Sequence, residues 1–208
     1  MEQRAIFDTV YTAVTSPNPH DHLSPGQLFF VDGKAGRGKT YLLNCLIMRL
    51  RSEHRSVAVC GSTALSATLY PRGRTAHSLF GIPVREDNNE IHSRINPSSD
   101  RGDYLRGLDL IVWEELPMAN KSTIEAVSRL LQSVTSQSLP FRGKILIALG
   151  DFRQVAPVIK NAGPSATLDA SIRSCSLWSH FHVLSLTLPV RNALLATLKL
   201  TGLPTNSK

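Results

Sequence analysis

One run of eight residues carries the side chains best suited to phosphate chemistry. Gly33-Lys34-Ala35-Gly36-Arg37-Gly38-Lys39-Thr40 matches the pattern G-x-x-x-x-G-K-[ST]. In such a loop the backbone N–H groups cradle phosphate oxygens, the lysine reaches the β- and γ-phosphates, and the final hydroxyl binds Mg²⁺. We therefore predict that the glycines of the run and Lys39 bind a nucleotide and that Thr40 binds Mg²⁺. The alternative is a glycine-rich turn with an accidental lysine.

The elements on either side of this run favour the phosphate-binding interpretation. The apolar residues 28–31 come just before it and predict a buried strand. A helical pattern follows, whose predicted apolar side consists of Tyr41, Leu42, Cys45, Leu46, Met48 and Leu50. Strand, glycine loop and helix form the arrangement that the pattern needs, because the N-terminus of the helix adds its own N–H groups and a positive dipole end.

A second constellation is a pair of carboxylates at the end of an apolar strand. Residues 108–113 predict this strand, and Glu114 and Glu115 follow it directly. The carboxyl edge of a parallel sheet is where ligands bind, and two adjacent acids there suit metal binding and activation of water. By their order, Glu114 is predicted to bind Mg²⁺ and Glu115 to orient or deprotonate the attacking water. The alternative is an exposed acidic pair that only ends the strand.

A third strand ends in polar groups in the same way. Residues 144–149 are apolar, and Gly150, Asp151, Arg153 and Gln154 follow. The amide of Gln154 both donates and accepts hydrogen bonds, which suits it to sense a γ-phosphate or to hold water. Asp151 and Arg153 suit a salt bridge that couples the nucleotide to a second ligand. The alternative is a simple turn at Gly150.

The remaining pattern predicts an α/β fold. Residues 56–60 and 183–186 predict two more strands, and residues 3–14, 62–70 and 120–132 predict helices. Residues 85–106 are polar and predict a surface excursion with short helical turns. Continuous apolar strands that alternate with helices indicate a mostly parallel sheet with helices on both faces. A chain of 208 residues is long enough for one good-sized domain of this kind.

Composition narrows the classes of partner. The net charge is +7, from 23 basic and 16 acidic residues, which favours a polyanion without proving one. The three cysteines, Cys45, Cys60 and Cys175, show no zinc-binding spacing. We predict that Cys45 and Cys60 are buried and reduced, as suits an intracellular compartment. No segment is apolar for long enough to span a membrane.

Taken together, these segments resemble a PIF-type 5′-to-3′ DNA helicase of superfamily 1B, related to RecD, with Helitron-like members the most similar. Residues 33–40 resemble motif I of that family, 60–67 and 73–80 motif Ia and its extension, 113–118 motif II, and 186–191 motif IV. Residues 150–158, Gly-Asp-Phe-Arg-Gln-Val-Ala-Pro-Val, resemble motif III and are the most family-specific stretch. Residues 2–5 are similar to the adenine-reading Q motif.

The resemblance implies an ATP-driven motor with RecA-like domains that moves along single-stranded DNA or DNA junctions. It divides the chain into a first RecA-like ATPase domain, residues 1–187, and the start of a second domain, residues 188–208. It implies that Glu115 is the catalytic base, Gln154 the γ-phosphate sensor, Arg191 the arginine finger and Gln3 the adenine contact. It places Thr63, Arg74, His77 and Phe80 near DNA, although Phe80 also suits a core position.

The resemblance also implies a monomer, a nuclear location with the mitochondrion as the alternative, and roles in DNA repair, recombination and telomere maintenance. Three features depart from the family pattern: Glu114 replaces an aspartate, Arg37 replaces a small hydroxyl residue, and the chain stops soon after Arg191. We therefore expect ATP binding, slow hydrolysis and no unwinding by this chain alone. Two alternatives stay open: a degenerate remnant that binds nucleotide or DNA, and a P-loop ATPase with a non-nucleic substrate.

Overall fold

A six-stranded parallel sheet forms the centre of the molecule. The computed structural model describes residues 2–16, 27–84, 90–135, 140–153 and 168–189, and the statements below concern these residues. The strands are β1 (Leu28–Gly33), β2 (Val57–Gly61), β3 (Arg74–Thr75), β4 (Leu110–Glu114), β5 (Ile145–Gly150) and β6 (Phe181–Leu186). They lie in the order β3-β2-β4-β5-β1-β6, and each neighbouring pair is parallel. The predicted α/β fold with a parallel sheet is confirmed.

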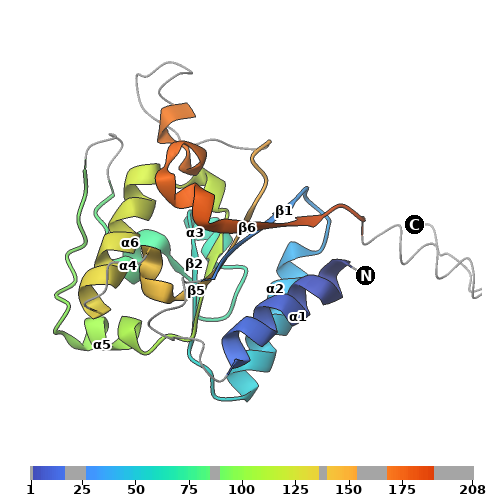
Figure 1. Cartoon of the computed structure of the whole chain (residues 1–208), viewed down its shortest axis with the longest axis horizontal. Coiled ribbons are helices and arrows are strands. Elements are labelled where there is room, and N and C mark those ends of the chain that lie inside the picture. The colour runs from blue at the N-terminus through green and yellow to red at the C-terminus, as the bar shows by residue number, and fades with distance from the viewer. Residues whose placement is uncertain (1, 17–26, 85–89, 136–139, 154–167, 190–208) are drawn as a thin grey trace, which may run out of the picture.

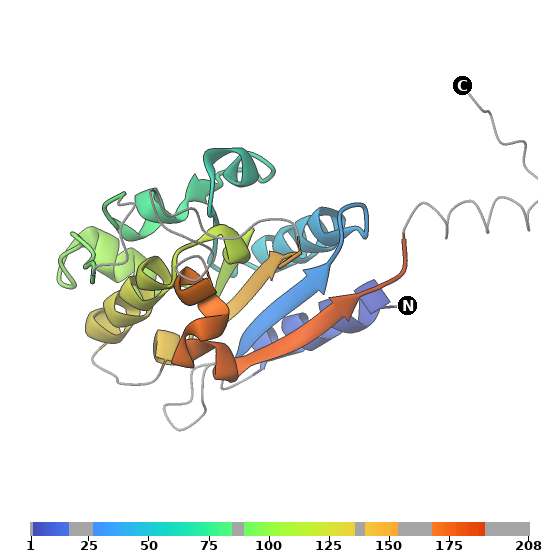
Figure 2. The ribbon, with the colours of Figure 1, turned by 90° about the horizontal axis from the view of Figure 1, so that it is seen from above.

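Helices cover both faces of the sheet (Figure 1). One layer contains α1 (Glu2–Thr15) and α2 (Lys39–Ser52), and the other contains α4 (Ala76–Phe80), α5 (Asp100–Arg106) and α6 (Lys121–Thr135). The short α3 (Ala64–Ala67) follows β2 directly. Single turns of 3₁₀ helix lie at Leu116–Met118, Pro140–Gly143, Ile172–Ser174 and Ser176–His180. Seen from above, β5, β1 and β6 run side by side in one direction (Figure 2).

The alternation of side chains along each strand builds two separate hydrophobic cores. In β1, Phe29 and Val31 pack into the core shared with α1 and α2, whereas Leu28 and Phe30 pack into the core shared with α4 and α6. Both faces of the central strands are therefore buried, which explains why these strands read as continuous apolar runs. The strands position the site because their carboxyl ends meet at one edge of the sheet.

The predicted apolar side of α2 was wrong in part. Tyr41 and Met48 were assigned to it, but their side chains are 70% and 72% exposed. The buried side consists of Leu42, Leu43, Leu46, Ile47 and Leu50. A step of about 100° per residue turns Tyr41 and Met48, seven residues apart, together onto the outward side. The expectation of burial was also wrong for Cys45, which is half-buried, and right for Cys60.

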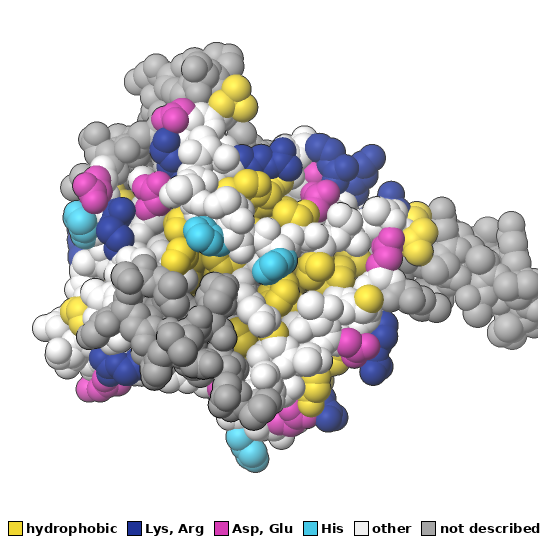
Figure 3. Space-filling model, viewed as in Figure 1, with side chains coloured by type: hydrophobic (Ala, Val, Ile, Leu, Met, Phe, Trp, Pro, Cys, Tyr) yellow, Lys and Arg dark blue, Asp and Glu magenta, His cyan; other side chains and the backbone are white. Residues whose placement is uncertain are grey.

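The surface carries mixed charge around local apolar areas. On the face of Figure 3, basic and acidic side chains are interspersed, and hydrophobic side chains are exposed near the middle of the view. The edge strand β6 contributes to such exposure, since Val183 is 52% exposed. Among the described helices, none has the length and hydropathy needed to cross a bilayer.

Candidate nucleotide site

The glycine loop joins the end of β1 to the start of α2. Gly36 and Gly38 have φ angles of 76° and 83°, in the left-handed region that glycine adopts most readily. Gly38 is the N-cap of α2 and offers no side chain to cap it. The first N–H groups of α2 therefore lack a side-chain partner at the point where the loop ends, and they are available to an anion.

The buried ammonium group of Lys39 lies at the centre of this region. Its side chain is only 8% exposed, and Nζ donates to the carbonyl oxygens of Gly33 at 2.5 Å and Lys34 at 3.4 Å. Burial raises the pKa of Glu114 and Glu115, and the charge of Lys39 partly offsets this rise; the same charge adds to the lowering of the pKa of Asp151. These groups come from the ends of β4 and β5, so two strand ends and the glycine loop converge on one cation.

Glu114 is buried and held by a tyrosine. Its side chain is 2% exposed, and its Oε2 atom accepts a hydrogen bond of 2.7 Å from the hydroxyl of Tyr70, which is itself 3% exposed. Burial raises the pKa of Glu114, and the hydrogen bond from Tyr70 partly offsets this. Burial raises the pKa of Tyr70, and the nearby Thr40 side chain partly offsets this rise. The two predicted Mg²⁺ ligands, Thr40 and Glu114, therefore both lie near the Tyr70 hydroxyl.

Glu115 leaves the strand in an unusual backbone conformation. Its φ and ψ of 55° and 44° lie in the left-handed region, which non-glycine residues seldom adopt. Burial raises the pKa of Glu115, the charge of Lys39 lowers it in part, and the charge of Asp151 raises it further. A carboxylate with a raised pKa is a stronger base while it remains ionised. Strained residues of this kind cluster at functional sites.

The predicted salt bridge between Asp151 and Arg153 is present. Arg153 Nε lies 2.6 Å from Asp151 Oδ1, and Nη2 lies 3.5 Å from Asp32 Oδ2 at the end of β1. Burial alone would raise the pKa of Asp151, but the hydrogen bonds and charge of Arg153 outweigh it and lower that pKa. Arg153 therefore connects the ends of β5 and β1 beside the glycine loop.

The N-terminal helix contacts the loop through the predicted adenine-reading residue. Gln3 Nε2 donates to the backbone oxygen of Arg37 at 3.1 Å. Arg37 in turn donates to the backbone oxygen of Thr187, and the Glu2 carboxylate accepts from the backbone N–H groups of Thr187 and Leu188 at 2.8 and 3.1 Å. These contacts tie α1, the loop and the segment after β6 together.

The residues predicted to lie near DNA differ in what their side chains do. Thr63 caps α3 by accepting from the N–H of Ser66 at 3.1 Å. His77 is half-buried, and burial lowers its pKa, which favours the neutral imidazole. The Arg74 side chain is exposed. The prediction of DNA contact by Phe80 was wrong: its ring is 0% exposed and stacks on Trp113, so no face is available to a base.

Some predicted residues lie outside the part of the chain that the structure describes. These are the proposed γ-phosphate sensor Gln154 and the proposed arginine finger Arg191, together with residues 190–208 of the second predicted domain. Conversely, sequence reasoning missed Tyr70. A single tyrosine after a helical segment matches no motif, and only the fold brings its hydroxyl to Glu114.

The residues present suit Mg²⁺ that is shared with a nucleotide. Among the described residues, no group of three or more histidine, cysteine, aspartate or glutamate side chains is arranged to hold a metal alone. Mg²⁺ is usually held by one or two protein oxygens, several waters and the substrate phosphates. The Thr40 hydroxyl and the Glu114 carboxylate, next to the phosphate-binding loop, fit that pattern.

Comparison with known proteins gives consistent results. The model of the PIF1-like helicase family matches residues 1–199. The chain is 31% identical over 168 residues to the ATP-dependent DNA helicase Pif1 of a Psychrobacter species, an alignment that covers 76% of this chain and 25% of that protein. It is 29% identical over 144 residues to the Candida albicans helicase PIF1, covering 68% of this chain and 16% of that protein.

Solved structures agree with this relationship. The crystal structure of Bacteroides Pif1 helicase in complex with ADP-AlF3 and single-stranded DNA superposes with a TM-score of 0.72 at 26% identity. It covers 91% of this chain and 42% of that one. Unliganded Bacteroides Pif1 gives a TM-score of 0.69, also at 26% identity, covering 95% of this chain and 44% of that one. The chain spans about a quarter of the Psychrobacter relative and less than half of these structures.

Proposed function

The chain belongs to the PIF1-like helicase family, and on that premise we propose that it is an ATP-hydrolysing motor lobe whose turnover responds to single-stranded DNA. The observation that carries the proposal is the convergence of Lys39, Glu114 and Glu115 at the carboxyl edge of the sheet, beside the glycine loop. The relatives named above are ATP-dependent DNA helicases, and one was crystallised with single-stranded DNA.

Binding is the role of the loop and its neighbours. The N–H groups of the loop and of the first turn of α2 would hold the phosphates, and the Lys39 ammonium would turn from the Gly33 carbonyl towards the β- and γ-phosphates. Thr40 and Glu114 would hold Mg²⁺, which when bound neutralises charge on the phosphates. Gln3, already against the loop at Arg37, would contact the adenine base.

Chemistry is the role of Glu115. Its carboxylate lies half-buried at the end of β4, where burial raises its pKa and prepares it to accept a proton from the attacking water. Its left-handed backbone turns the chain sharply after the strand. Gln154 and Arg191 keep their proposed roles as γ-phosphate sensor and arginine finger. Thr63, Arg74 and His77 are the proposed DNA contacts.

The experiment is Mg²⁺-dependent phosphate release from ATP, with and without a short oligodeoxythymidine. We expect turnover that DNA stimulates and that falls about a hundredfold or more in Lys39→Ala, because an essential charge at the phosphates is lost. Lys34→Ala is the matched control, since Lys34 is an exposed lysine of the same loop. It should keep its turnover.

Two other results would point elsewhere. Turnover that is lost in Lys39→Ala but is not stimulated by DNA would indicate a P-loop ATPase with a non-nucleic substrate. ATP binding that Lys39→Ala abolishes, without turnover in the wild type, would indicate a nucleotide-binding remnant.

A further inference from the structure

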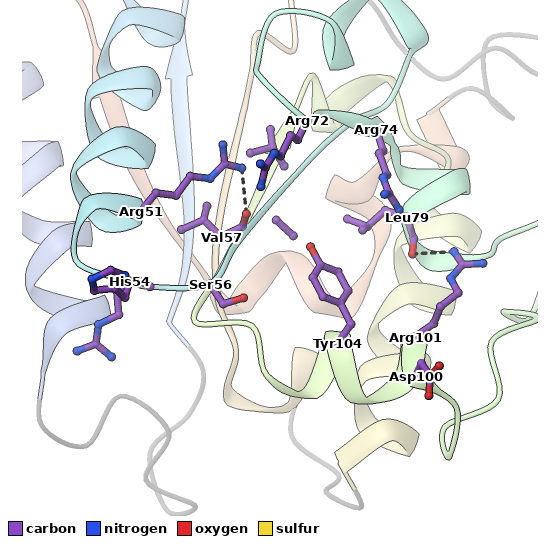
Figure 4. A pocket seen from close by; sticks show the side chains of 13 residues that line it. Arg51, His54, Ser56, Val57, Arg72, Arg74, Leu79, Asp100, Arg101 and Tyr104 are labelled. Carbon is purple, nitrogen blue, oxygen red and sulfur yellow. Dashed lines mark hydrogen bonds between the residues drawn. The ribbon is translucent and has the colours of Figure 1, made fainter.

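A pocket at the outer edge of the sheet contains one proposed DNA contact, Arg74, but its other residues have no role in the proposed function. Within the described residues, β3 pairs with β2 only at Cys60 and Gly61, so the first part of β2 has no neighbouring strand on its outer side. A pocket of about 700 Å³ opens at this place, lined by the end of α2, the turn before β3 and the start of α5 (Figure 4). Two strands, β4 and β5, separate β2 from β1. The glycine loop follows the carboxyl end of β1, whereas the pocket borders the amino end of β2.

The pocket lining is strongly basic. It includes five arginines and one histidine but a single carboxylate; these residues are Arg51, His54, Arg55, Arg72, Arg74, Arg101 and Asp100. Among the described residues, Arg55 alone of the five arginines has a carboxylate partner, Asp109, at 3.4 Å. Arg51 and Arg101 donate to backbone oxygens at 3.1 and 2.6 Å, and neither has a carboxylate partner among the described residues.

Arg72 and Arg74 reach into the pocket from above in Figure 4. Both side chains are exposed, and neither guanidinium forms a hydrogen bond or ion pair within the part of the chain that the structure describes. Four guanidinium groups without a carboxylate partner among these residues therefore surround one hollow. Such a hollow concentrates positive potential, and guanidinium groups match the geometry of phosphate oxygens.

The backbone at Arg72 has a left-handed conformation that glycine adopts with less strain. The N–H of Gly73 donates to the oxygen of Tyr70 at 3.0 Å, which closes a turn with Pro71 and Arg72 at its centre. Arg72 has a φ of 63°, and the third position of such a turn favours glycine or asparagine. Arginine therefore holds this position against its backbone preference, as residues at ligand sites often do.

We propose that this pocket binds the phosphodiester backbone of a nucleic-acid strand, at a site separate from the nucleotide loop. Arg51, Arg72, Arg74 and Arg101 contact phosphate oxygens. Tyr104, 47% exposed, points into the pocket from α5 and offers its ring to a base (Figure 4). A volume of about 700 Å³ far exceeds what one phosphate group needs and lies within the range of pockets for larger ligands. The inference rests on the proposed function for the choice of nucleic acid as partner and shares one residue with it, Arg74.

An acidic peptide added to the open edge of β2 fits the pocket less well. Arg51 donates to the backbone oxygen of Val57, so the backbone groups of Val57 point towards the open edge. Because a strand repeats every two residues, the backbone groups of Val59 point the same way. The Val57 oxygen is already bonded. Only two residues therefore face the edge, and too few main-chain groups remain to hold an added strand.

The test is binding of fluorescent oligodeoxythymidine to the nucleotide-free 208-residue chain over a series of salt concentrations. The main variant is Arg72→Gly combined with Arg74→Gln. We expect affinity to fall roughly tenfold or more, because two charge-assisted contacts are lost. The slope of log K against log salt should become shallower by about 1.4, since each phosphate contact of a single strand contributes about 0.7.

Controls separate binding from folding. Arg72→Gly alone should unfold at the same or a higher temperature than the wild type, because it removes the left-handed arginine, yet it should bind DNA more weakly. Arg94→Gln removes one exposed arginine outside the pocket and should leave the salt slope unchanged. Tyr104→Leu should weaken binding without changing the slope.

The outcomes are distinct. Equal slopes and affinities for the wild type and the double variant would overturn the inference, even if DNA still stimulates ATP hydrolysis. Inorganic tripolyphosphate that competes as well as the oligonucleotide, with no effect of Tyr104→Leu, would overturn the nucleic-acid assignment in favour of a free polyphosphate. A glutamate-rich peptide that binds in place of DNA would likewise overturn it.

Discussion

Removal of the Tyr70 hydroxyl should reveal how the metal-binding acid is held. Tyr70→Phe keeps the ring in its buried position and deletes only the group that donates to Glu114 at 2.7 Å. Glu114 is 2% exposed, so water does not readily replace the lost donor. The hydrogen bond from Tyr70 lowers the pKa of Glu114, so its loss also leaves the ionised carboxylate less favourable in its buried site.

The expected magnitude follows from burial. A hydrogen bond to a charged group contributes about 1.5–3 kcal/mol, and a buried polar group left without a partner costs about 1–3 kcal/mol. We therefore expect the free energy of unfolding to fall by about 2 kcal/mol. For a domain of this size, that change lowers Tm by about 4–8 °C.

Tyr11→Phe is a matched control for this measurement. The Tyr11 hydroxyl donates to Glu53 Oε1 at 2.8 Å, but Glu53 also pairs with Arg49 at 2.6 Å and its side chain is 29% exposed. Water and Arg49 can replace the lost donor, so the expected loss is below about 1 kcal/mol. Thermal and urea unfolding of the metal-free variants at neutral pH measure both values.

A second readout concerns the metal. Because Tyr70 positions Glu114, Tyr70→Phe should raise the Mg²⁺ concentration needed for half-maximal ATP hydrolysis, whereas Tyr11→Phe should not. Equal losses of stability in the two variants, with unchanged Mg²⁺ dependence, would refute the view that Tyr70 holds the metal-binding carboxylate.

Three further changes test the packing around the site. Gly150→Ala should lower the free energy of unfolding by about 1–3 kcal/mol in urea titrations, because a Cβ atom there would lie 2.3 Å from Cδ of Pro117; wild-type stability would contradict the close approach. Phe80→Ala should cost about 3–5 kcal/mol in the same assay and leave the salt slope of DNA binding unchanged; a shallower slope would return Phe80 to the DNA interface. The loss of unfolding free energy caused by Arg153→Gln should be smallest at acidic pH. The folded pKa of Asp151 lies below its unfolded value, so the stability that it contributes is present above about pH 4 and is lost as pH falls through the folded pKa. Unfolding measured from pH 7 down to pH 2 should show the gap between the two proteins closing, and a constant gap would contradict the pairing.

The glycine loop, the five longer strands and the acidic strand end were predictable because each depends on local sequence, whereas the two-residue β3 was not predicted. A short apolar run bounded by polar residues predicts a strand that is buried on both faces. The predicted ends of β4 and β5 lie within two residues of the observed ends. The family resemblance then placed Lys39, Thr40 and the acidic pair in one site. The parallel sheet follows from the alternation of strands and helices.

Contacts between distant segments were not predictable in this way. Tyr70 and Glu114 are 44 residues apart, and only the packing of β2 against β4 and the turn before β3 brings them together. The outward side of α2 was misjudged because Tyr41 and Met48 are apolar enough to mimic a buried stripe. The basic pocket draws its arginines from segments that share no motif, so no local pattern could reveal it.

The central claim is that binding and chemistry are divided between neighbouring side chains of one site, with Glu115 as the base. The most direct test compares nucleotide affinity and Mg²⁺-dependent ATP turnover for the wild type and Glu115→Gln. The account predicts unchanged affinity and turnover that falls about 10²- to 10⁴-fold in the variant, the range typical of a lost general base. Turnover equal to that of the wild type, or loss of affinity together with turnover, would contradict it.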